Sequence, residues 1–468
     1  MAEIGTETNP ARVAIVGSGP AGFYAAEHLP KLEDTTVEVD MFDRLPTPYG
    51  LVRAGVAPDH PKIKSVIRVY EKTAARPGFR FFGNVEVGKD VSAAELAERY
   101  HAVVFAYGTS VDRHLGIPGE DLPGSHSATE FVNWYNAHPD FADAEFDLSC
   151  ETALVIGNGN VATDVARMLA LTREELEETD TAEHAIEALA ESGIKEIVIL
   201  GRRGPAQAAF TNPEVRELGE LIDADIDIDE SECDLDEVSR EFMDSDEADP
   251  TTRRNVELFT DFSKRAPEGK NKRVVMRFLR SPVEIEGDGK VERVIVGKNE
   301  LERDETGAIK ARDTGERETI ECGLVFRSIG YKGVPVEGVP FSEKRGLIPN
   351  EGGRVVEDGE QVPGLYVVGW IKRGPSGVIG TNKKDAQDTV DNLVADLQAG
   401  KLPEPELASD PTAIESLLAE RKPDHITYTG WQAIDAAEVA RGEPKGRPRV
   451  KFIRVEEMLE AAKAPVGD

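Results

Sequence analysis

The chain has 468 residues, more than one hydrophobic core usually supports, so two or more domains are expected. Its formal net charge of -33 disfavours nucleic acid or an anionic membrane as a general partner, because their phosphate groups would be repelled. No apolar run is long enough to span a bilayer, and the N-terminus lacks the basic start and apolar stretch of a secretory signal. The composition therefore predicts a soluble, cytoplasmic protein with no membrane span.

Cysteine usage limits the redox chemistry that the protein itself can supply. The three cysteines, Cys150, Cys233 and Cys322, lie far apart and form no Cys-x-x-Cys pair. A protein-borne iron–sulfur cluster needs four ligands, and a dithiol relay needs two neighbouring thiols. Any redox centre is therefore expected to be a bound organic cofactor, and no metal site is expected.

Two segments of the chain show the order strand, glycine-rich turn, helix, strand. In the first, strands over 12–16 and 37–42 flank a helix over 21–29. In the second, strands over 152–156 and 196–200 flank a helix that starts near residue 160 and a longer, highly charged helical stretch. Continuous apolar runs of this kind are typical of buried parallel strands, and the order is that of a βαβ unit. Two dinucleotide sites are therefore predicted in one chain.

The first turn has the spacing Gly17-x-Gly19-x-x-Gly22. These glycines allow a tight turn, close approach of the backbone to a pyrophosphate, and packing of the helix on the strand. The helix N-terminus then faces the anion. Asp43 ends the next strand, where a carboxylate that binds the ribose belongs.

The second turn, Gly157-x-Gly159-x-x-Ala162, is a variant that the same fingerprint allows. Its next strand ends in Arg202 and Arg203 instead of a carboxylate. Two permanent cations at this place suit the 2′-phosphate of NADP through charge-assisted hydrogen bonds. The second site is therefore predicted to prefer NADP over NAD.

The remaining segments of the chain show weaker patterns than the two glycine-rich turns. Residues 223–249 include fourteen acidic residues among twenty-seven and are interpreted as an exposed insertion or mobile loop. The stretch 273–297 is predicted to form alternating strands with a hairpin at 287–289, and 324–329 is predicted to close that domain. A later strand near 364–370 and a helix over 382–397 are predicted to complete the first domain.

Several long motifs resemble those of the adrenodoxin reductase family, which includes bacterial NADPH–ferredoxin reductases. The most specific is the segment YGLVRAGVAPDHP at 49–61. Further matches, spread over almost the whole chain, are GNVATDVAR at 159–167, GRRGP at 201–205 and GWIKRGPSGVIGTN at 369–382.

The two βαβ units, together with the resemblance, predict an α/β protein with two Rossmann-like dinucleotide-binding domains, the NADP domain inserted into the FAD domain. The expected FAD-binding domain is 1–112 completed by 331–468 with a C-terminal extension, and the expected NADP-binding domain is 113–330. The residues that we expect to bind FAD are Gly17, Gly19, Pro20, Ala21, Gly22, Asp43, Leu51, Val52, Trp370, Gly377, Val378 and Ile379. Those expected to bind NADP(H) are Gly157, Gly159, Asn160, Val161, Arg202, Arg203 and Glu214.

The same resemblance makes His60, Asp164 and Glu214 the candidate catalytic residues. In the family, the matching side chains lie near the junction of flavin and nicotinamide, where they could relay protons or hold the nicotinamide carboxamide. Titratable groups there can balance the charge that changes as electrons arrive in pairs and leave singly.

The implied reaction is hydride transfer from NADPH to FAD, followed by single-electron transfer to a ferredoxin-type iron–sulfur protein. Such partners are usually acidic, so a local basic surface is required on this acidic chain. The candidate is the basic stretch within 253–273, which contains Arg253, Arg254, Lys264, Arg265, Lys270, Lys272 and Arg273. Two alternatives share both fingerprints: a flavin-dependent monooxygenase and a redox sensor that binds FAD and NADPH without rapid turnover. A disulfide reductase is disfavoured by the missing dithiol.

Overall fold

The computed structural model describes residues 4–29 and 35–464, and the chain divides into two compact units. Unit 1 comprises Met1–Val111 and Gly330–Asp468, and unit 2 comprises Asp112–Ile329. The predicted domains differ from these units by one residue at each boundary. The two segments that connect the units pair as the short strands β5 (Val111–Asp112) and β15 (Tyr331–Lys332).

Unit 1 is built on a sheet that has seven strands within the described residues. Five strands run parallel in the order β18-β4-β1-β2-β3, and two antiparallel strands extend the edge beyond β18 in the order β16-β17. The strands are β1 (Ala11–Val16), β2 (Val37–Phe42), β3 (Phe79–Phe82), β4 (Ala102–Phe105), β16 (Asn350–Glu351), β17 (Arg354–Glu357) and β18 (Glu360–Val367).

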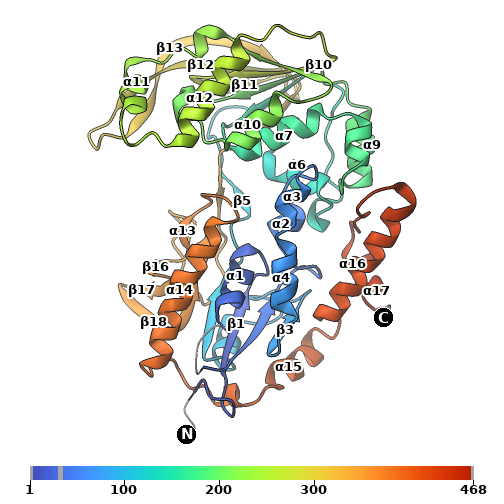
Figure 1. Ribbon diagram of the computed structural model, residues 1–468, viewed down its shortest axis with the longest axis vertical. Coiled ribbons are helices and arrows are strands. Elements are labelled where there is room, and N and C mark those ends of the chain that lie inside the picture. Colours follow the sequence, from blue (N-terminus) through green and yellow to red (C-terminus); the bar gives the residue numbers. More distant parts are fainter. Residues whose placement is uncertain (1–3, 30–34, 465–468) are drawn as a thin grey trace. The chain divides into compact units, whose positions relative to one another are not determined.

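The apolar run of β1 is buried on both faces of this sheet. Val13 and Ile15 pack into one apolar cluster, and Ala14 and Val16 pack into another. Side chains of a strand alternate between its two faces, so a strand covered on both sides is apolar throughout. Helices α1 and α14 lie side by side over the first cluster (Figure 1). The helices of unit 1 are α1 (Pro20–His28), α2 (Leu51–Ala54), α3 (Pro61–Lys64), α4 (Ile67–Ala74), α5 (Ala93–Ala97), α13 (Trp370–Arg373), α14 (Thr381–Gln398), α15 (Ala413–Arg421), α16 (Tyr428–Gly442) and α17 (Val455–Ala461).

Unit 2 contains a parallel sheet and a separate antiparallel sheet. The parallel sheet has the order β6-β14-β7-β8-β10-β9, and the antiparallel one has the order β11-β12-β13. Its strands are β6 (Ser125–Ser127), β7 (Thr152–Ile156), β8 (Glu196–Leu200), β9 (Ala224–Ile228), β10 (Lys272–Arg277), β11 (Arg280–Glu286), β12 (Arg293–Arg303), β13 (Ile309–Glu321) and β14 (Leu324–Arg327). The predicted hairpin at 287–289 is confirmed as the loop between β11 and β12.

Three of the helices of unit 2, α7 to α9, match the helical segments predicted after the second glycine turn. A long helix after the second glycine turn is followed by two short ones, which form the predicted charged helical stretch. The helices are α6 (Ala128–Tyr135), α7 (Asn160–Ala170), α8 (Arg173–Glu177), α9 (Glu183–Ala190), α10 (Asn212–Leu218), α11 (Glu237–Asp244) and α12 (Pro250–Ser263). Nowhere in the described ranges of either unit does a helix combine the length and apolar character needed to cross a bilayer.

The interpretation of 223–249 as an exposed insertion or mobile loop is wrong. The segment contains β9, which pairs in parallel with β10, and helix α11. Within β9, Ala224, Ile226 and Ile228 are buried while the alternating aspartates are partly exposed. This period of two is the signature of a strand with one covered face, and the high acidic content concealed it.

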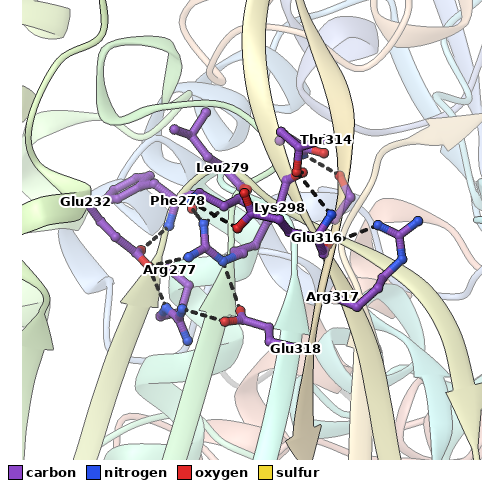
Figure 2. A network of polar contacts seen from close by, with 12 residues as sticks. Glu232, Arg277, Phe278, Leu279, Lys298, Thr314, Glu316, Arg317 and Glu318 are labelled. Atoms are coloured by element: carbon purple, nitrogen blue, oxygen red, sulfur yellow. Dashed lines mark hydrogen bonds and ion pairs between the residues drawn. The ribbon is translucent and has the colours of Figure 1, made fainter.

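The acidic segment is also tied to the strands beside it by ion pairs (Figure 2). Glu232 accepts hydrogen bonds from Arg277 Nε at 2.8 Å and from the Phe278 N–H at 2.7 Å. Arg277 also lies 3.2 Å from Glu318 on β13. These acidic side chains therefore hold two sheets of unit 2 together.

Candidate functional site

The first glycine turn, residues 17–22 of unit 1, joins β1 to α1. Gly17 has φ of +108°, a conformation that L side chains rarely adopt, and a Cβ there would lie 2.7 Å from the Ala106 carbonyl. A Cβ on Gly22 would lie 2.1 Å from Gly17 O, whereas one on Gly19 would meet nothing within 4 Å. No side chain caps α1 at Pro20. The turn therefore leaves open space beside uncapped N–H groups, which fits a pyrophosphate.

Asp43 lies directly after β2 and fastens the first turn. Its Oδ2 accepts hydrogen bonds from the Ser18 N–H at 2.9 Å and the Ser18 hydroxyl at 2.5 Å, and its Oδ1 accepts one from the Leu45 N–H at 2.9 Å. Burial raises the pKa of the Asp43 carboxyl above its ordinary value, although these hydrogen bonds oppose the shift. A carboxylate has about four acceptor positions, so Asp43 retains capacity for one ligand hydroxyl.

The segment 49–52 lies against the same turn. The Tyr49 N–H donates to Ser18 O at 3.0 Å, and a Cβ on Gly50 would lie 2.9 Å from Gly19 Cα. The Val52 side chain is fully buried, whereas Leu51 is 40% exposed. The structure therefore brings these two predicted residues to the first glycine turn.

Trp370, far along the chain, also lies close to the first turn. A Cβ on Gly369 would lie only 2.5 Å from Ala21 Cβ, so the start of α13 abuts the start of α1. The Trp370 ring stacks on Tyr331 with centroids 6.0 Å apart and an interplanar angle of 15°. Within the described part of the chain, its buried Nε1–H has no hydrogen-bond acceptor. An unpaired buried donor fits a ligand acceptor at this place.

Residues 377–379 form the loop that leads into α14. Val378 is 53% exposed, and Ile379 packs against the apolar cluster that α1 and α14 cover. The Asn382 side chain, in the first turn of α14, lies 3.7 Å from the position of a Cβ on Gly369. This loop therefore leads into a helix whose first turn lies beside Gly369, next to the start of α1.

The second glycine turn, residues 157–162 of unit 2, repeats the geometry of the first. Gly157 has φ of +145°, and a Cβ there would lie 2.2 Å from Ser328 O. A Cβ on Gly159 would meet nothing within 4 Å, and no side chain caps α7, which starts at Asn160. The Asn160 Oδ1 accepts a hydrogen bond from the Thr211 N–H at 2.8 Å. This turn again offers open space and uncapped N–H groups to an anion.

Arg202 and Arg203 follow β8, beside the second turn. Their backbone carbonyls are held by Asn299 Nδ2 at 2.8 Å and by the Leu279 N–H at 3.1 Å, respectively. Neither guanidinium has a hydrogen-bond or acidic partner among the described residues. Burial and the neighbouring Arg202 charge lower the pKa of Arg203 below its ordinary value. Two anchored but unpaired cations form a place for a dianionic group such as a phosphate.

Asn158 is a residue of this turn that sequence reasoning did not select. Its Nδ2 lies 3.3 Å from the position of a Cβ on Gly201, directly before the two arginines. The Nδ2 group is buried, and no acceptor for it occurs in residues 4–29 and 35–464. Its position in the middle of the glycine motif was the available signal.

Asp164 and Glu214, two of the candidate catalytic residues, meet around a buried arginine. Arg167 is 2% exposed, and its guanidinium lies 3.0 Å from Asp164, 2.7 Å from Glu214 and 3.4 Å from Glu217. Arg167 ends the GNVATDVAR motif, but sequence reasoning gave it no role. Removing one member of such a buried ionic cluster is costly, because the others remain charged and out of water.

His60, the third candidate, belongs to unit 1. It is 9% exposed and precedes α3, where its carbonyl accepts a hydrogen bond from the Ile63 N–H at 3.1 Å. His60 therefore lies at the start of the short helix α3, which is the next helix in the chain after α2.

Most of the basic stretch at 253–273 is paired within the chain. Arg273 contacts Glu196 and Asp227, Arg254 pairs with Glu257 at 2.7 Å, and Lys270 pairs with Glu268 at 3.2 Å. Lys272 donates to Leu169 O at 2.7 Å, and Arg265 donates to Gly219 O at 3.0 Å. The acidic partners of Arg254, Lys270 and Arg273 reduce the positive charge that the stretch presents to another protein.

The chain matches a family model and several known reductases. The model of the pyridine nucleotide-disulphide oxidoreductase family matches residues 11–199. NADPH-ferredoxin reductase FprA of Mycobacterium leprae (strain TN) is 52% identical over 451 residues, which cover 96% of this chain and 97% of that protein. The mitochondrial NADPH:adrenodoxin oxidoreductase of Salvelinus fontinalis is 43% identical over 472 residues, covering 98% and 92%. This chain belongs to the NADPH–ferredoxin reductases of the adrenodoxin reductase family.

A solved structure supports the fold of this reductase over most of its length. Mycobacterium tuberculosis FprA in complex with NADPH superposes with a TM-score of 0.91 and is 51% identical, covering 97% of this chain and 100% of that one. The resemblance drawn from the motifs is thereby confirmed. The predicted α/β class with two Rossmann-like units is also confirmed.

Proposed function

We propose that this chain oxidises NADPH by hydride transfer to a bound FAD and then reduces a ferredoxin-type iron–sulfur protein one electron at a time. The observation that carries the proposal is the contrast between the two glycine turns. One is followed by a carboxylate, Asp43, and the other by two unpaired arginines, Arg202 and Arg203.

NADPH is assigned to unit 2. Gly157, Gly159, Asn160 and Val161 form the turn for its pyrophosphate, and Arg202 with Arg203 receive its 2′-phosphate. NADH lacks that phosphate, so it would leave both arginines unpaired and bind more weakly. The relative that carries NADPH in its solved structure supports this assignment.

FAD is assigned to unit 1. Gly17, Gly19, Pro20, Ala21 and Gly22 hold its pyrophosphate, and Asp43 holds its ribose. The segment at Leu51 and Val52, the Trp370 side chain, and the loop Gly377, Val378 and Ile379 enclose the flavin end. When bound, FAD supplies what no side chain can, which is acceptance of a hydride followed by release of single electrons. The chain's own residues bind the FAD, orient it and shield it from water.

We assign His60, Asp164 and Glu214 to proton handling and to orientation of the nicotinamide. Arg167 contacts both carboxylates, at 3.0 Å and 2.7 Å, and so holds them in fixed positions. His60→Gln should lower kcat about tenfold or more and flatten the pH profile of kcat between about pH 5 and 8, as for loss of an acid–base group. An unchanged pH profile would remove His60 from this role.

The partner is proposed to be a small iron–sulfur protein, in accordance with the names of the relatives. We place the reductase in the cytoplasm. Its three cysteines are free, as is usual for proteins of a reducing compartment.

The test is a side-by-side assay of the purified chain. Its visible spectrum should show bound flavin, and NADPH should drive ferredoxin-dependent cytochrome reduction far faster than NADH. A colourless protein that added FAD does not activate would contradict the flavin assignment. A yellow protein indifferent to ferredoxin would favour the monooxygenase or the redox sensor, which the relatives do not support.

A further inference from the structure

The segment Tyr49–Arg53 has a backbone that needs outside support. Tyr49 has φ of +84° and Gly50 has φ of +48°, although the first of these is not glycine. A bulky residue in this region is strained and persists only when its surroundings hold it there. The segment also lies directly against Ser18 and Gly19 of the first glycine turn.

The C-terminal helix α16 supplies part of this support through aromatic side chains. The Trp431 Nε1–H donates to the Tyr49 hydroxyl oxygen at 3.3 Å, and the Tyr428 and Tyr49 hydroxyls lie 2.9 Å apart. The rings of Tyr49 and Trp431 meet edge to face with centroids 5.6 Å apart. Both hydrogen bonds hold the strained residue itself.

The same helix supplies a buried ion pair. Arg53 donates to both carboxylate oxygens of Glu438, at 2.9 and 2.5 Å, and the Glu438 side chain is fully buried. The Arg53 guanidinium also lies over the Trp431 ring, 5.2 Å from its centroid. Lys451, after the helix, donates to the Arg53 carbonyl at 3.1 Å. A bidentate pair of this kind fixes direction as well as distance.

These contacts come from one side of α16. Tyr428, Trp431 and Glu438 are separated by three and seven residues, which is the spacing of one helix face. The C-terminal region, which sequence analysis left without a role, thus contacts the segment that the first nucleotide site requires.

We propose that α16 is a positioning element for the flavin end of the first site. Through Glu438 with Arg53 and through its aromatic contacts with Tyr49, it fixes the backbone of Leu51 and Val52 against the first glycine turn. This inference rests on the proposed function, because it assumes that flavin is bound there.

The test compares two buried carboxylates in the full-length chain. Glu438→Gln keeps the shape of the side chain but leaves Arg53 without its anion. Its FAD dissociation constant should rise about tenfold or more, in accordance with the loss of a charged hydrogen-bonded pair. Its flavin absorption band and midpoint potential should shift as well. The affinity for NADP⁺, which belongs to unit 2, should stay within about twofold of wild type, since separate sites are usually additive.

The matched control is Asp396→Asn. Asp396 on α14 is also buried, with Arg354 Nε at 2.7 Å and the Tyr366 hydroxyl at 2.8 Å, but it lies near the far end of its helix from the first site. This variant should lower the unfolding temperature without changing flavin affinity or spectrum. If Glu438→Gln also loses stability yet keeps a wild-type flavin site, the positioning role is overturned.

A second variant covers the case in which Glu438→Gln does not fold. Tyr428→Phe removes one hydroxyl and keeps the ring, so a rise in the FAD dissociation constant of about fourfold is expected for one neutral hydrogen bond. No rise with Tyr428→Phe would then overturn the inference. A wild-type chain that binds no flavin would overturn the proposed function, and this inference with it.

Discussion

The two glycine turns share one backbone design and differ in the residues placed after the next strand. In both, the first glycine has positive φ, the second faces open space, and the helix starts without a side-chain cap. After β2 the chain places Asp43, which accepts hydrogen bonds from the turn itself. After β8 it places Arg202 and Arg203, whose backbones are anchored and whose guanidinium groups have no acidic partner in the described ranges.

The comparison teaches that the turn and the strand end have separate tasks. The turn provides N–H groups and space for any pyrophosphate, and it does so in both units. The strand end decides which ribose is accepted, because a carboxylate suits hydroxyls and a pair of cations suits a phosphate. Changing the residues at the end of one strand should therefore alter the binding of one nucleotide and leave the binding of the other unaffected.

The largest effect on cofactor binding is expected at the third glycine position of the motif, which is Gly22 in unit 1 and Ala162 in unit 2. Gly22→Ala would place a Cβ 2.1 Å from Gly17 O, whereas Ala162 already occupies the matching place in unit 2. Overpacking against a backbone should weaken FAD binding about 100-fold. Flavin content after gel filtration measures this. Ala162→Gly is the control and should leave the KM for NADPH within about twofold, with only the stability cost of a helical glycine.

A smaller effect is expected at the strand end of unit 1. Asp43→Ala removes two hydrogen bonds from Ser18 of the first turn, one from the Leu45 N–H, and the carboxylate proposed to bind the ribose, so the FAD dissociation constant should rise about tenfold. Asp43→Asn should give an intermediate value, because it keeps one acceptor oxygen. FAD titration of the apoprotein would settle the order. An unchanged FAD dissociation constant in Asp43→Ala would show that Asp43 does not bind FAD.

The smallest effect concerns acid stability beside the first turn. Burial tends to raise the pKa of Glu438, but Arg53, the Phe452 N–H and Arg449 together more than offset this, so its pKa in the folded protein is below the ordinary value. The stabilisation is then complete above the unfolded pKa of about 4.3 and is lost as pH falls through the folded value. Glu438→Gln should flatten the acid limb of the stability curve by up to about 1.4 kcal/mol per pH unit. The free energy of unfolding would be measured with urea at several acidic pH values. If it falls equally with pH in wild type and in Glu438→Gln, this prediction is contradicted.

Sequence reasoning found the parts of the site that depend on local pattern. The two glycine motifs, the apolar strands and the residues after β2 and β8 follow one another within short stretches, so their spacing fixes their geometry. The fold class followed from the repeated βαβ order for the same reason.

The remaining features depend on contacts that spacing does not encode. Arg53 and Glu438 are 385 residues apart in the chain, and Arg167 meets Glu214 across 47 residues. Strand β9 was missed because composition was weighed above alternation, although Ile226 and Ile228 marked its buried face. Asn158 could have been selected from its place within the second glycine turn.

The most direct test of the central claim is the cofactor preference of the double variant Arg202→Gln, Arg203→Gln. Loss of two charge-assisted hydrogen-bonding groups should lower kcat/KM for NADPH about 100-fold and change that for NADH less than about threefold. Flavin content should stay at the wild-type level, and Arg254→Gln, which removes an exposed arginine paired with Glu257, should change neither value. An equal fall for both nucleotides, or no fall for NADPH, would contradict the claim that the strand end selects the ligand.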